Sequence, residues 1–340
     1  MNVKRYVLDT PARAEKGRGL KVVAKRYTVG ASSRNSQGLT LVFAHCIGSH
    51  KEQWEPVIER LFSLQRMKDR TRQIREAWSF DWQNHGDSAV LNHELLKDRP
   101  EGVSVCEWTP VITDFVRSPR MKGHHIVPIG HSAGTAAIML TTKEIPPYKL
   151  AYAAMILIEP TMITRELFNA HLEDRMASMD FAVAATSARR NIWKSREAAF
   201  EYFRKRFPWG MWDERVVRVL VEHGLESLPN GEVTLKCDRK QEAVSYPDTE
   251  PHFESAMQLG RICHTVPVHL IWGTRNDLVP EFIQDSLSDA SEGRIVASVT
   301  KIKKAGHMVV QEQPDVLAQT IAGILDTVKV ESGVVERSKL

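Results

Sequence analysis

The stretch of sequence that decides the fold runs from 125 to 142 and reads His-Ile-Val-Pro-Ile-Gly-His-Ser-Ala-Gly-Thr-Ala-Ala-Ile-Met-Leu-Thr-Thr. An apolar strand over 125–129 is predicted to end in a G-x-S-x-G turn, and a helix of small residues over 135–142 is predicted to follow. A turn this tight strains the backbone of its serine, and the two glycines leave out side chains that would clash with the strand and the helix. The pattern predicts that Ser132 is exposed above a sheet as a nucleophile.

The same order of strand, loop and helix repeats on both sides of this stretch. Continuous apolar runs between helical patterns predict an α/β fold with a mostly parallel sheet and helices on both faces, and the first two strands indicate an antiparallel opening. The predicted strands lie at 3–9, 20–28, 39–44, 75–80, 153–158, 267–272 and 295–301, and flanking helices at 54–64 and 314–328.

Between about 164 and 259 the rhythm changes to long amphipathic stretches rich in Arg, Met and Trp, without apolar strand runs. This segment is predicted to be a helical cap inserted into the α/β domain. We expect a core over 1–162 and 262–330, the cap over 163–261 and a tail over 331–340.

A base for the serine is predicted at His307. A serine hydroxyl is a weak nucleophile, so a base must take its proton and a third group must orient that base. His307 stands in Lys-Ala-Gly-His-Met, directly after the last predicted strand and before the closing helix. That place fits the chain order of nucleophile, acid and histidine that accompanies such turns.

With these motifs, the sequence resembles the α/β-hydrolase family over nearly its whole length. The segments His45-Cys-Ile-Gly-Ser-His-Lys-Glu-Gln-Trp-Glu-Pro56 and Asp81-Trp-Gln-Asn-His-Gly-Asp-Ser88 are similar to a fungal group of peroxisomal members in toxin and secondary-metabolite pathways. That group includes an acyl-CoA hydrolase of mycophenolic acid biosynthesis.

The resemblance implies an α/β-hydrolase fold with no metal and no cofactor. It also implies hydrolysis of an acyl-CoA thioester or related ester of a secondary-metabolite or fatty acyl intermediate, through an acyl-enzyme on Ser132. A carboxylic ester hydrolase or lipase, a lyase or acyltransferase, and a non-catalytic ligand-binding relative are alternatives that the sequence leaves open.

The acid of the triad is open between two residues. Most family members carry an Asp three residues after a Gly at the end of the penultimate strand, but here that place holds Asn276, which has no charge to stabilise an imidazolium. Asp277 is one residue late and serves only if the loop shifts by one position. Glu159 ends the strand after the elbow helix, where a carboxylate is held more rigidly, so we favour Glu159 and keep Asp277 as the alternative.

The negative charge that develops on a substrate oxygen needs two fixed N–H donors. The backbone of Ala133, directly after the nucleophile, is predicted to give one, and the backbone of Ile47, in the loop after the strand 39–44, is predicted to give the other. Relatives usually carry a Gly where this chain has Cys46. Because no base signature adjoins it, Cys46 is interpreted as a small buried residue.

The cap supplies aromatic side chains that suit a hydrophobic acyl pocket. Trp193, Trp209 and Trp212 are candidates for substrate contact, although each also fits the cap's own core. The basic residues Arg189, Arg190 and Lys194 suit either an anionic coenzyme A headgroup or a solvated helix face.

Four polar residues at strand ends, His45, Asp81, His85 and Asp87, lack the spacing of metal ligands, so we interpret them as residues that order loops. The four cysteines lie far apart without a C-x-x-C pair, which fits a reducing compartment.

Charge and targeting signals limit the partners. The net charge of +4 is spread without a long basic run, so nucleic acid is not expected. No apolar run approaches the roughly 18 residues of a membrane span, and no secretory signal precedes the first strand. The last residues, Ser338-Lys339-Leu340, match the peroxisomal import signal, so we expect the import receptor as a partner and the peroxisome as the location.

Overall fold

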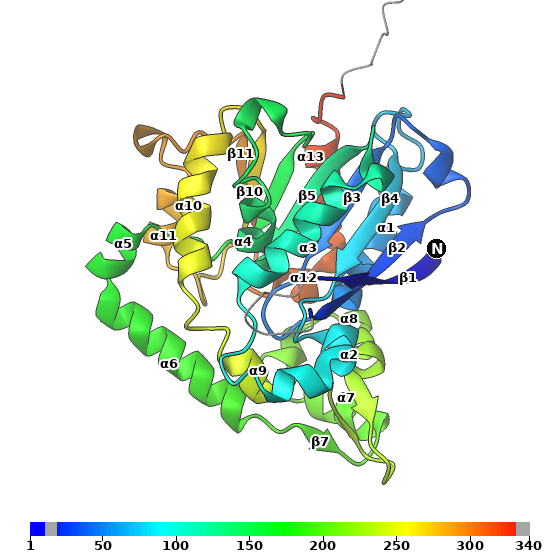
Figure 1. The fold of residues 1–340 in the computed structure, drawn as a ribbon, viewed down its shortest axis with the longest axis vertical. Helices are drawn as coiled ribbons and strands as arrows, with labels where there is room; N and C mark the ends of the chain where they lie inside the picture. The colour runs from blue at the N-terminus through cyan, green and yellow to red at the C-terminus, as the bar shows by residue number, and fades with distance from the viewer. Residues whose placement is uncertain (11–18, 331–340) are drawn as a thin grey trace, which may run out of the picture.

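The computed structural model describes residues 1–10 and 19–330, and its centre is an eight-stranded sheet (Figure 1). Strand β2 runs antiparallel to its neighbours β1 and β4, and the strands from β4 to β11 are parallel to one another. The predicted mostly parallel sheet with an antiparallel opening is therefore confirmed. In spatial order the strands are β1 (Asn2–Asp9), β2 (Lys21–Thr28), β4 (Ile74–Phe80), β3 (Leu39–Ala44), β5 (His125–His131), β6 (Met155–Ile158), β10 (Val268–Gly273) and β11 (Ser298–Ile302).

Helices cover both faces of this sheet, which explains why strands such as β3 are buried along their whole length. Leu41 and Phe43 of β3 pack into the hydrophobic cluster of one face, and Val42 and Ala44 pack into that of the other. The first face carries α1 (Glu55–Gln65), α12 (Val309–Glu312) and α13 (Pro314–Leu325); the second carries α2 (Gly86–Lys97), α3 (Val105–Arg117), α4 (Ala133–Leu140), α10 (Glu250–Ile262) and α11 (Glu281–Ser286).

Short 3-10 helices complete the connections of the α/β domain. They are η1 (Ser32–Arg34), η2 (Lys51–Trp54), η3 (Pro119–Met121), η4 (Pro147–Lys149) and η6 (Ala290–Glu292). Within residues 1–10 and 19–330, we find no helix whose length and apolar character would let it cross a lipid bilayer.

Whereas α10 stands beside the sheet, most of the segment between β6 and β10, over residues 172–243, lies toward the lower end of the molecule in Figure 1. It carries its own hydrophobic cluster, which includes Trp193, Phe203 and Trp212. Its elements before α10 are α5 (Arg165–Ala170), α6 (Leu172–Ala188), β7 (Ile192–Trp193), α7 (Arg196–Arg204), η5 (Trp209–Met211), α8 (Glu214–His223), β8 (Leu225–Ser227), β9 (Val233–Leu235) and α9 (Arg239–Ala243).

Two features of this segment differ from the predicted all-helical cap. Strands β7, β9 and β8 form a small antiparallel sheet, whose strands of two or three residues are too short to show an alternating pattern in the sequence. Helix α10 packs against α4, and its residues Phe253, Ala256 and Leu259 join the core of the main sheet. It therefore belongs to the helical layer of the α/β domain.

Candidate active site

The turn between β5 and α4 has the geometry that its sequence predicts. Ser132 has a φ of 53° and a ψ of −122°, a backbone conformation that residues other than glycine rarely adopt. A Cβ added to Gly130 would lie 2.5 Å from the carbonyl oxygen of Gly134, and one added to Gly134 would overlap the carbonyl oxygen of Ala44. Both glycines are therefore required for the close packing of β5, α4 and β3 that holds Ser132 in this conformation.

His307 lies beside this serine, in the loop between β11 and α12. Its Nε2 is 2.9 Å from the Ser132 Oγ, and both side chains are buried. The backbone carbonyl of His307 accepts a hydrogen bond of 2.7 Å from the Nε2 of His131, the residue before the nucleophile. The elbow and the histidine loop are thus tied together by backbone as well as by side chain.

Glu159 lies on the side of the His307 imidazole that faces away from Ser132. Its Oε2 is 3.2 Å from the Nδ1 of His307, and its Oε1 accepts a hydrogen bond from the backbone N–H of Gly273. Glu159 is buried, has a φ of 48°, and donates its own N–H to the carbonyl of Ile271 at 2.8 Å. Because an ionised carboxylate only accepts, the Nδ1 of His307 carries the proton and the Nε2 is left to accept from the serine hydroxyl.

Asp277 contacts the backbone of His307 and not its ring. The Asp277 Oδ1 accepts from the His307 N–H at 2.7 Å, while the Oδ2 lies 3.0 Å from the Arg275 guanidinium. Arg275 also pairs with Glu312 at 2.7 Å and donates to the carbonyl of Lys304. The structure therefore brings Glu159 to the imidazole and places Asp277 in a set of contacts that shapes the loop.

The two predicted oxyanion donors lie on neighbouring segments. The close packing of Gly134 against the carbonyls of Ala44 and His45 places the loop after β3 alongside the first turn of α4. Among the hydrogen bonds between described residues, none uses the backbone N–H of Ile47 or of Ala133. Both N–H groups are thus free of a protein acceptor, as an oxyanion hole requires.

Cys46 is buried in the same loop, and its Sγ lies 3.8 Å from the Nε2 of Gln311. Burial raises the pKa of the Cys46 thiol to about 12, so the thiol stays protonated near neutral pH. A protonated thiol is a poor nucleophile, which agrees with the interpretation of Cys46 as a packing residue.

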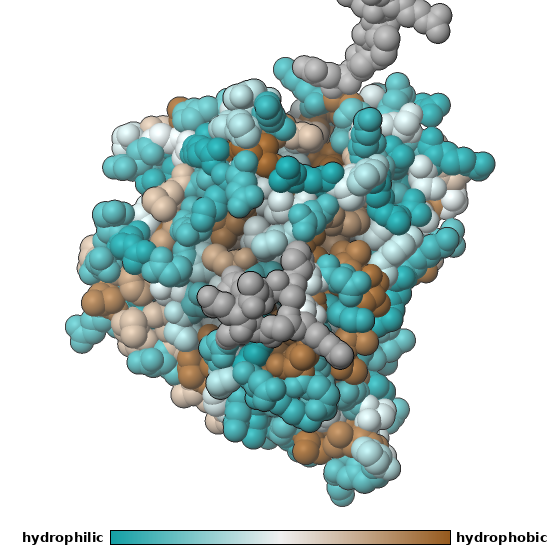
Figure 2. Space-filling view, viewed as in Figure 1, coloured by the Kyte–Doolittle hydropathy of each residue, from teal (hydrophilic) through white to brown (hydrophobic). Residues whose placement is uncertain are grey.

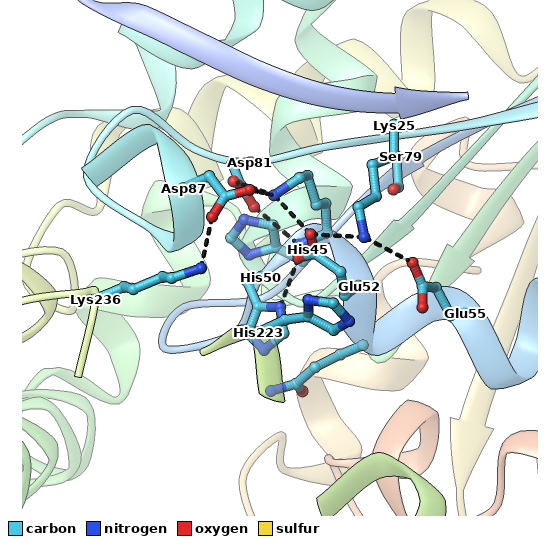
Figure 3. A network of polar contacts seen from close by, with 12 residues as sticks. Lys25, His45, His50, Glu52, Glu55, Ser79, Asp81, Asp87, His223 and Lys236 are labelled. Carbon is cyan, nitrogen blue, oxygen red and sulfur yellow. Dashed lines mark hydrogen bonds and ion pairs between the residues drawn. The ribbon is translucent and has the colours of Figure 1, made fainter. Parts of the chain in front are cut away.

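A network of charges around Lys51 adjoins the loop after β3, and Figure 3 labels its carboxylates Glu52, Asp81 and Asp87. The Lys51 ammonium lies 2.8 Å from Glu52, 2.9 Å from Asp81 and 2.9 Å from Asp87. Burial alone would lower the pKa of Lys51, but the three carboxylates outweigh it and raise that pKa above its ordinary value. The network reaches the cap through Lys236, which lies 2.6 Å from Asp87.

Two neutral histidines fix the backbone of this loop. His45 donates from Nδ1 to the carbonyl of Cys46 at 2.7 Å and accepts at Nε2 from the N–H of Trp82. The Nε2 of His85 accepts from the N–H of Gly48 at 3.0 Å. These contacts agree with the prediction that His45 and His85 order loops, and no group of three or more His, Cys, Asp or Glu side chains suited to a metal occurs within the described ranges.

The cap contacts the loop after β3 through an ion pair that the sequence did not indicate. Glu242 of α9 is buried and forms an ion pair with Arg189. One guanidinium nitrogen of Arg189 lies 2.9 Å from the Glu242 Oε1. Gly48, with a φ of 73°, lies directly beneath, because a Cβ added there would come within 2.6 Å of the Glu242 Oε1. Arg189 therefore neutralises a carboxylate beside the oxyanion loop and does not form a solvated face.

The three tryptophans predicted for substrate contact lie in the cap's hydrophobic cluster. Trp193 and Trp212 are buried in it, and Trp209 packs against it. Met308, next to His307, packs against the same cluster. The structure thus connects this cluster to the histidine loop, and substrate contact by the tryptophans stays a prediction.

Acid is expected to destabilise the fold through buried histidines. Burial lowers the pKa of His45 and of His131 from 6.5 to about 3. The unfolded chain binds these protons between about pH 6.5 and pH 3 while the folded chain does not. The stability present above pH 6.5 is therefore lost as the pH falls through this window, by up to about 1.4 kcal/mol per pH unit for each histidine.

Urea unfolding at several pH values measures this slope. The variant His45→Gln is expected to reduce the change in unfolding free energy per pH unit. The exposed control His93→Gln is expected to leave that change unaltered. Equal slopes in the native protein and in His45→Gln would contradict the assignment.

Comparisons with known proteins agree with this architecture. A model of the Alpha/beta hydrolase family matches residues 41–320. The peroxisomal alpha-beta-hydrolase Lpx1 from Saccharomyces cerevisiae is 20% identical with a TM-score of 0.74, over 96% of this chain and 88% of that chain. A thioesterase domain from the curacin biosynthetic pathway is 14% identical with a TM-score of 0.64, over 96% of this chain and 100% of that domain. The Mycobacterium tuberculosis esterase Rv0045c is 20% identical with a TM-score of 0.60, over 95% of this chain and 92% of that chain.

A comparison with curated proteins finds no match. At these identities the solved structures show the fold alone, whereas the family match spans most of the chain, including the elbow and the histidine loop. The chain therefore belongs to the α/β-hydrolase family.

Proposed function

We propose that the protein is a serine hydrolase of (thio)ester bonds, in which Ser132 is the nucleophile, His307 the base and Glu159 the acid. One observation carries the proposal: the His307 imidazole lies between the Ser132 Oγ at 2.9 Å and the Glu159 Oε2 at 3.2 Å. This is the spacing that lets one ring accept a proton from a hydroxyl while a carboxylate stabilises the resulting imidazolium.

In the proposed reaction, the Ser132 oxygen attacks the acyl carbonyl and its proton passes to the Nε2 of His307. The N–H groups of Ala133 and Ile47 bind the oxyanion of the tetrahedral intermediate. The imidazolium returns the proton to the departing thiol or alcohol, which leaves an acyl group on Ser132. A water molecule then gives its proton to His307 and attacks the ester, and Ser132 is released with a carboxylic acid.

We propose an acyl-CoA thioester with a fatty or polyketide acyl chain as the substrate class. The support is the resemblance of segments 45–56 and 81–88 to fungal peroxisomal hydrolases and the thioesterase among the structural neighbours. An ordinary carboxylic ester is the second candidate, supported by the neighbouring esterase.

The proposed nucleophile is tested by labelling with a fluorophosphonate followed by peptide mapping. We expect a single adduct on Ser132, since only an activated serine reacts with such reagents. The variant Ser132→Ala controls for reaction elsewhere and is expected to take up no label. Absence of an adduct on Ser132 in the folded native protein would favour a non-catalytic binding protein.

The bond type is tested with an acyl-CoA and the methyl ester of the same acid. We expect kcat/KM to be larger for the thioester, because a thiol with a pKa of about 8.5 is a better leaving group than an alcohol. Hydrolysis of the methyl ester alone would reject the thioesterase assignment and retain the serine esterase.

We propose the peroxisome as the location. The support is the tripeptide Ser338-Lys339-Leu340, which lies outside the described residues, together with the peroxisomal origin named for the yeast neighbour. Import of a fluorescent fusion that keeps this tripeptide exposed, and its loss in the variant Leu340→Asp, would test the proposal and its expected receptor.

A further inference from the structure

One surface of the cap combines positive charge with exposed apolar side chains. Residues 204–212 read Arg-Lys-Arg-Phe-Pro-Trp-Gly-Met-Trp, so that three cations are followed directly by aromatic and thioether side chains. Between 189 and 218 the chain carries nine basic and four acidic residues, a surplus of five positive charges, whereas the whole chain has a net charge of +4. This surplus is local to residues 189–218, because the whole cap over 163–261 carries 15 basic and 16 acidic residues.

The apolar side chains of this segment point into solvent. Phe207 is 77% exposed and Met211 is 44% exposed. The turn that presents them is held by backbone hydrogen bonds, from the Gly210 N–H to the Arg206 carbonyl at 2.7 Å and from the Met211 N–H to the Pro208 carbonyl at 3.0 Å. Phe207 and Met211 therefore form an exposed apolar tip on a hydrogen-bonded turn.

Cations surround the same turn. The Arg206 guanidinium lies 5.0 Å from the ring centroid of Tyr202, and the Arg190 guanidinium lies 5.5 Å from the same centroid. Among the described residues, neither arginine has a carboxylate within ion-pair distance. Their charges are thus available to an external anion. We call Arg190, Tyr202, Arg206, Phe207 and Met211 the cap surface.

Closely packed aromatic side chains lie beneath the cap surface. Trp193 and Phe203 are buried beneath it, and Tyr202 and Trp209 pack against them with ring centroids 5.0–6.4 Å apart. The charged and apolar side chains therefore stand on a rigid support. Figure 2 shows hydrophobic side chains next to hydrophilic ones at this end of the molecule, where β7 and α7 lie.

We propose that the cap surface docks on an anionic phospholipid bilayer, with Phe207 and Met211 in the headgroup region and Arg190 and Arg206 paired with lipid phosphates. An aromatic tip flanked by cations is the chemistry that binds such an interface, because the apolar side chains leave water while the charges stay in contact with anionic headgroups. Docking of this kind is reversible and needs no spanning helix.

The experiment measures sedimentation of the full-length protein with vesicles. One set contains phosphatidylcholine alone, and the other contains roughly three parts phosphatidylcholine to one part phosphatidylserine. The native protein is expected to sediment with the anionic vesicles, less with the neutral ones, and to be released by added salt.

Two variants separate the apolar and ionic contributions. Phe207→Ala is expected to weaken vesicle binding about tenfold, because a large apolar side chain no longer leaves water. Arg206→Gln is expected to weaken it about fivefold and to reduce the effect of salt. The matched control is Tyr148→Ala, which removes an aromatic ring that is 78% exposed outside the cap and is expected to change nothing. Circular dichroism verifies that every variant is folded.

The proposal is overturned if the native protein does not sediment with anionic vesicles, or if Phe207→Ala binds them as tightly as the native protein does. Concentration-dependent dimerisation that Phe207→Ala abolishes, without vesicle binding, would assign the cap surface to a second copy of the chain instead. None of these outcomes depends on hydrolytic activity, so the result is independent of the proposed function.

Discussion

Replacing Glu159 with Gln is expected to lower kcat by about four orders of magnitude, with little change in stability. The amide keeps the shape of the carboxylate and still accepts from the Gly273 N–H. It removes the charge that stabilises the His307 imidazolium, and its NH2 group can hold the imidazole in the wrong tautomer, with the proton on the nitrogen that faces Ser132. Steady-state hydrolysis of a soluble activated ester measures the loss.

Asp277→Asn is the matched control for this experiment. Its amide oxygen can still accept from the backbone N–H of His307, so we expect a change in kcat of less than about tenfold. The pH profile gives a second readout, because a residue that only shapes the loop has no reason to move the apparent pKa of the base. A large loss in Asp277→Asn and a small one in Glu159→Gln would transfer the acid role to Asp277.

These two carboxylates show what the sequence was able to predict about the site. Ser132 follows an apolar strand and His307 follows the last strand of the sheet, and the carboxyl ends of parallel strands meet at one edge of a sheet, so their proximity was predictable. The acid was not decided, because Glu159 and Asp277 both follow strand ends. Only the fold shows that β10 fixes Glu159 beside the imidazole, while the one-residue displacement of Asp277 directs its carboxylate to the backbone of His307.

The sheet was predictable for a related reason, because strands buried on both faces give continuous apolar runs. The small sheet of the cap was missed, since two or three residues show no period. The charged residues Lys51 and Glu242 were missed because a charge in the sequence is usually a solvated one. Their burial depends on partners such as Asp81 for Lys51 and Arg189 for Glu242, which lie 30 and 53 positions away in the chain, and no local pattern reveals such partners.

Replacing Lys51 with Met is expected to lower the free energy of unfolding by about 3–5 kcal/mol. Lys51 is fully buried, and its ammonium is the shared partner of Glu52, Asp81 and Asp87. Without it, the buried Asp81 keeps the backbone N–H groups of Lys51 and Ser88 but, within residues 1–10 and 19–330, has no cation at hydrogen-bond distance. An unpaired carboxylate in the interior must either take up a proton or draw in water, and either outcome favours the unfolded chain.

Lys68→Met is the matched control, because Lys68 forms an ion pair of the same kind with Asp326 at 2.8 Å on the surface. Exposed pairs contribute about 0–1 kcal/mol, so urea unfolding should separate the two variants clearly. The double variant Lys51→Met with Asp81→Asn should recover part of the loss, since it removes the charge that was left without a partner. Similar unfolding midpoints for Lys51→Met and Lys68→Met would show that the loop after β3 keeps its shape without the buried ion pairs. In that case the histidines His45 and His85 would have to hold the oxyanion loop by themselves.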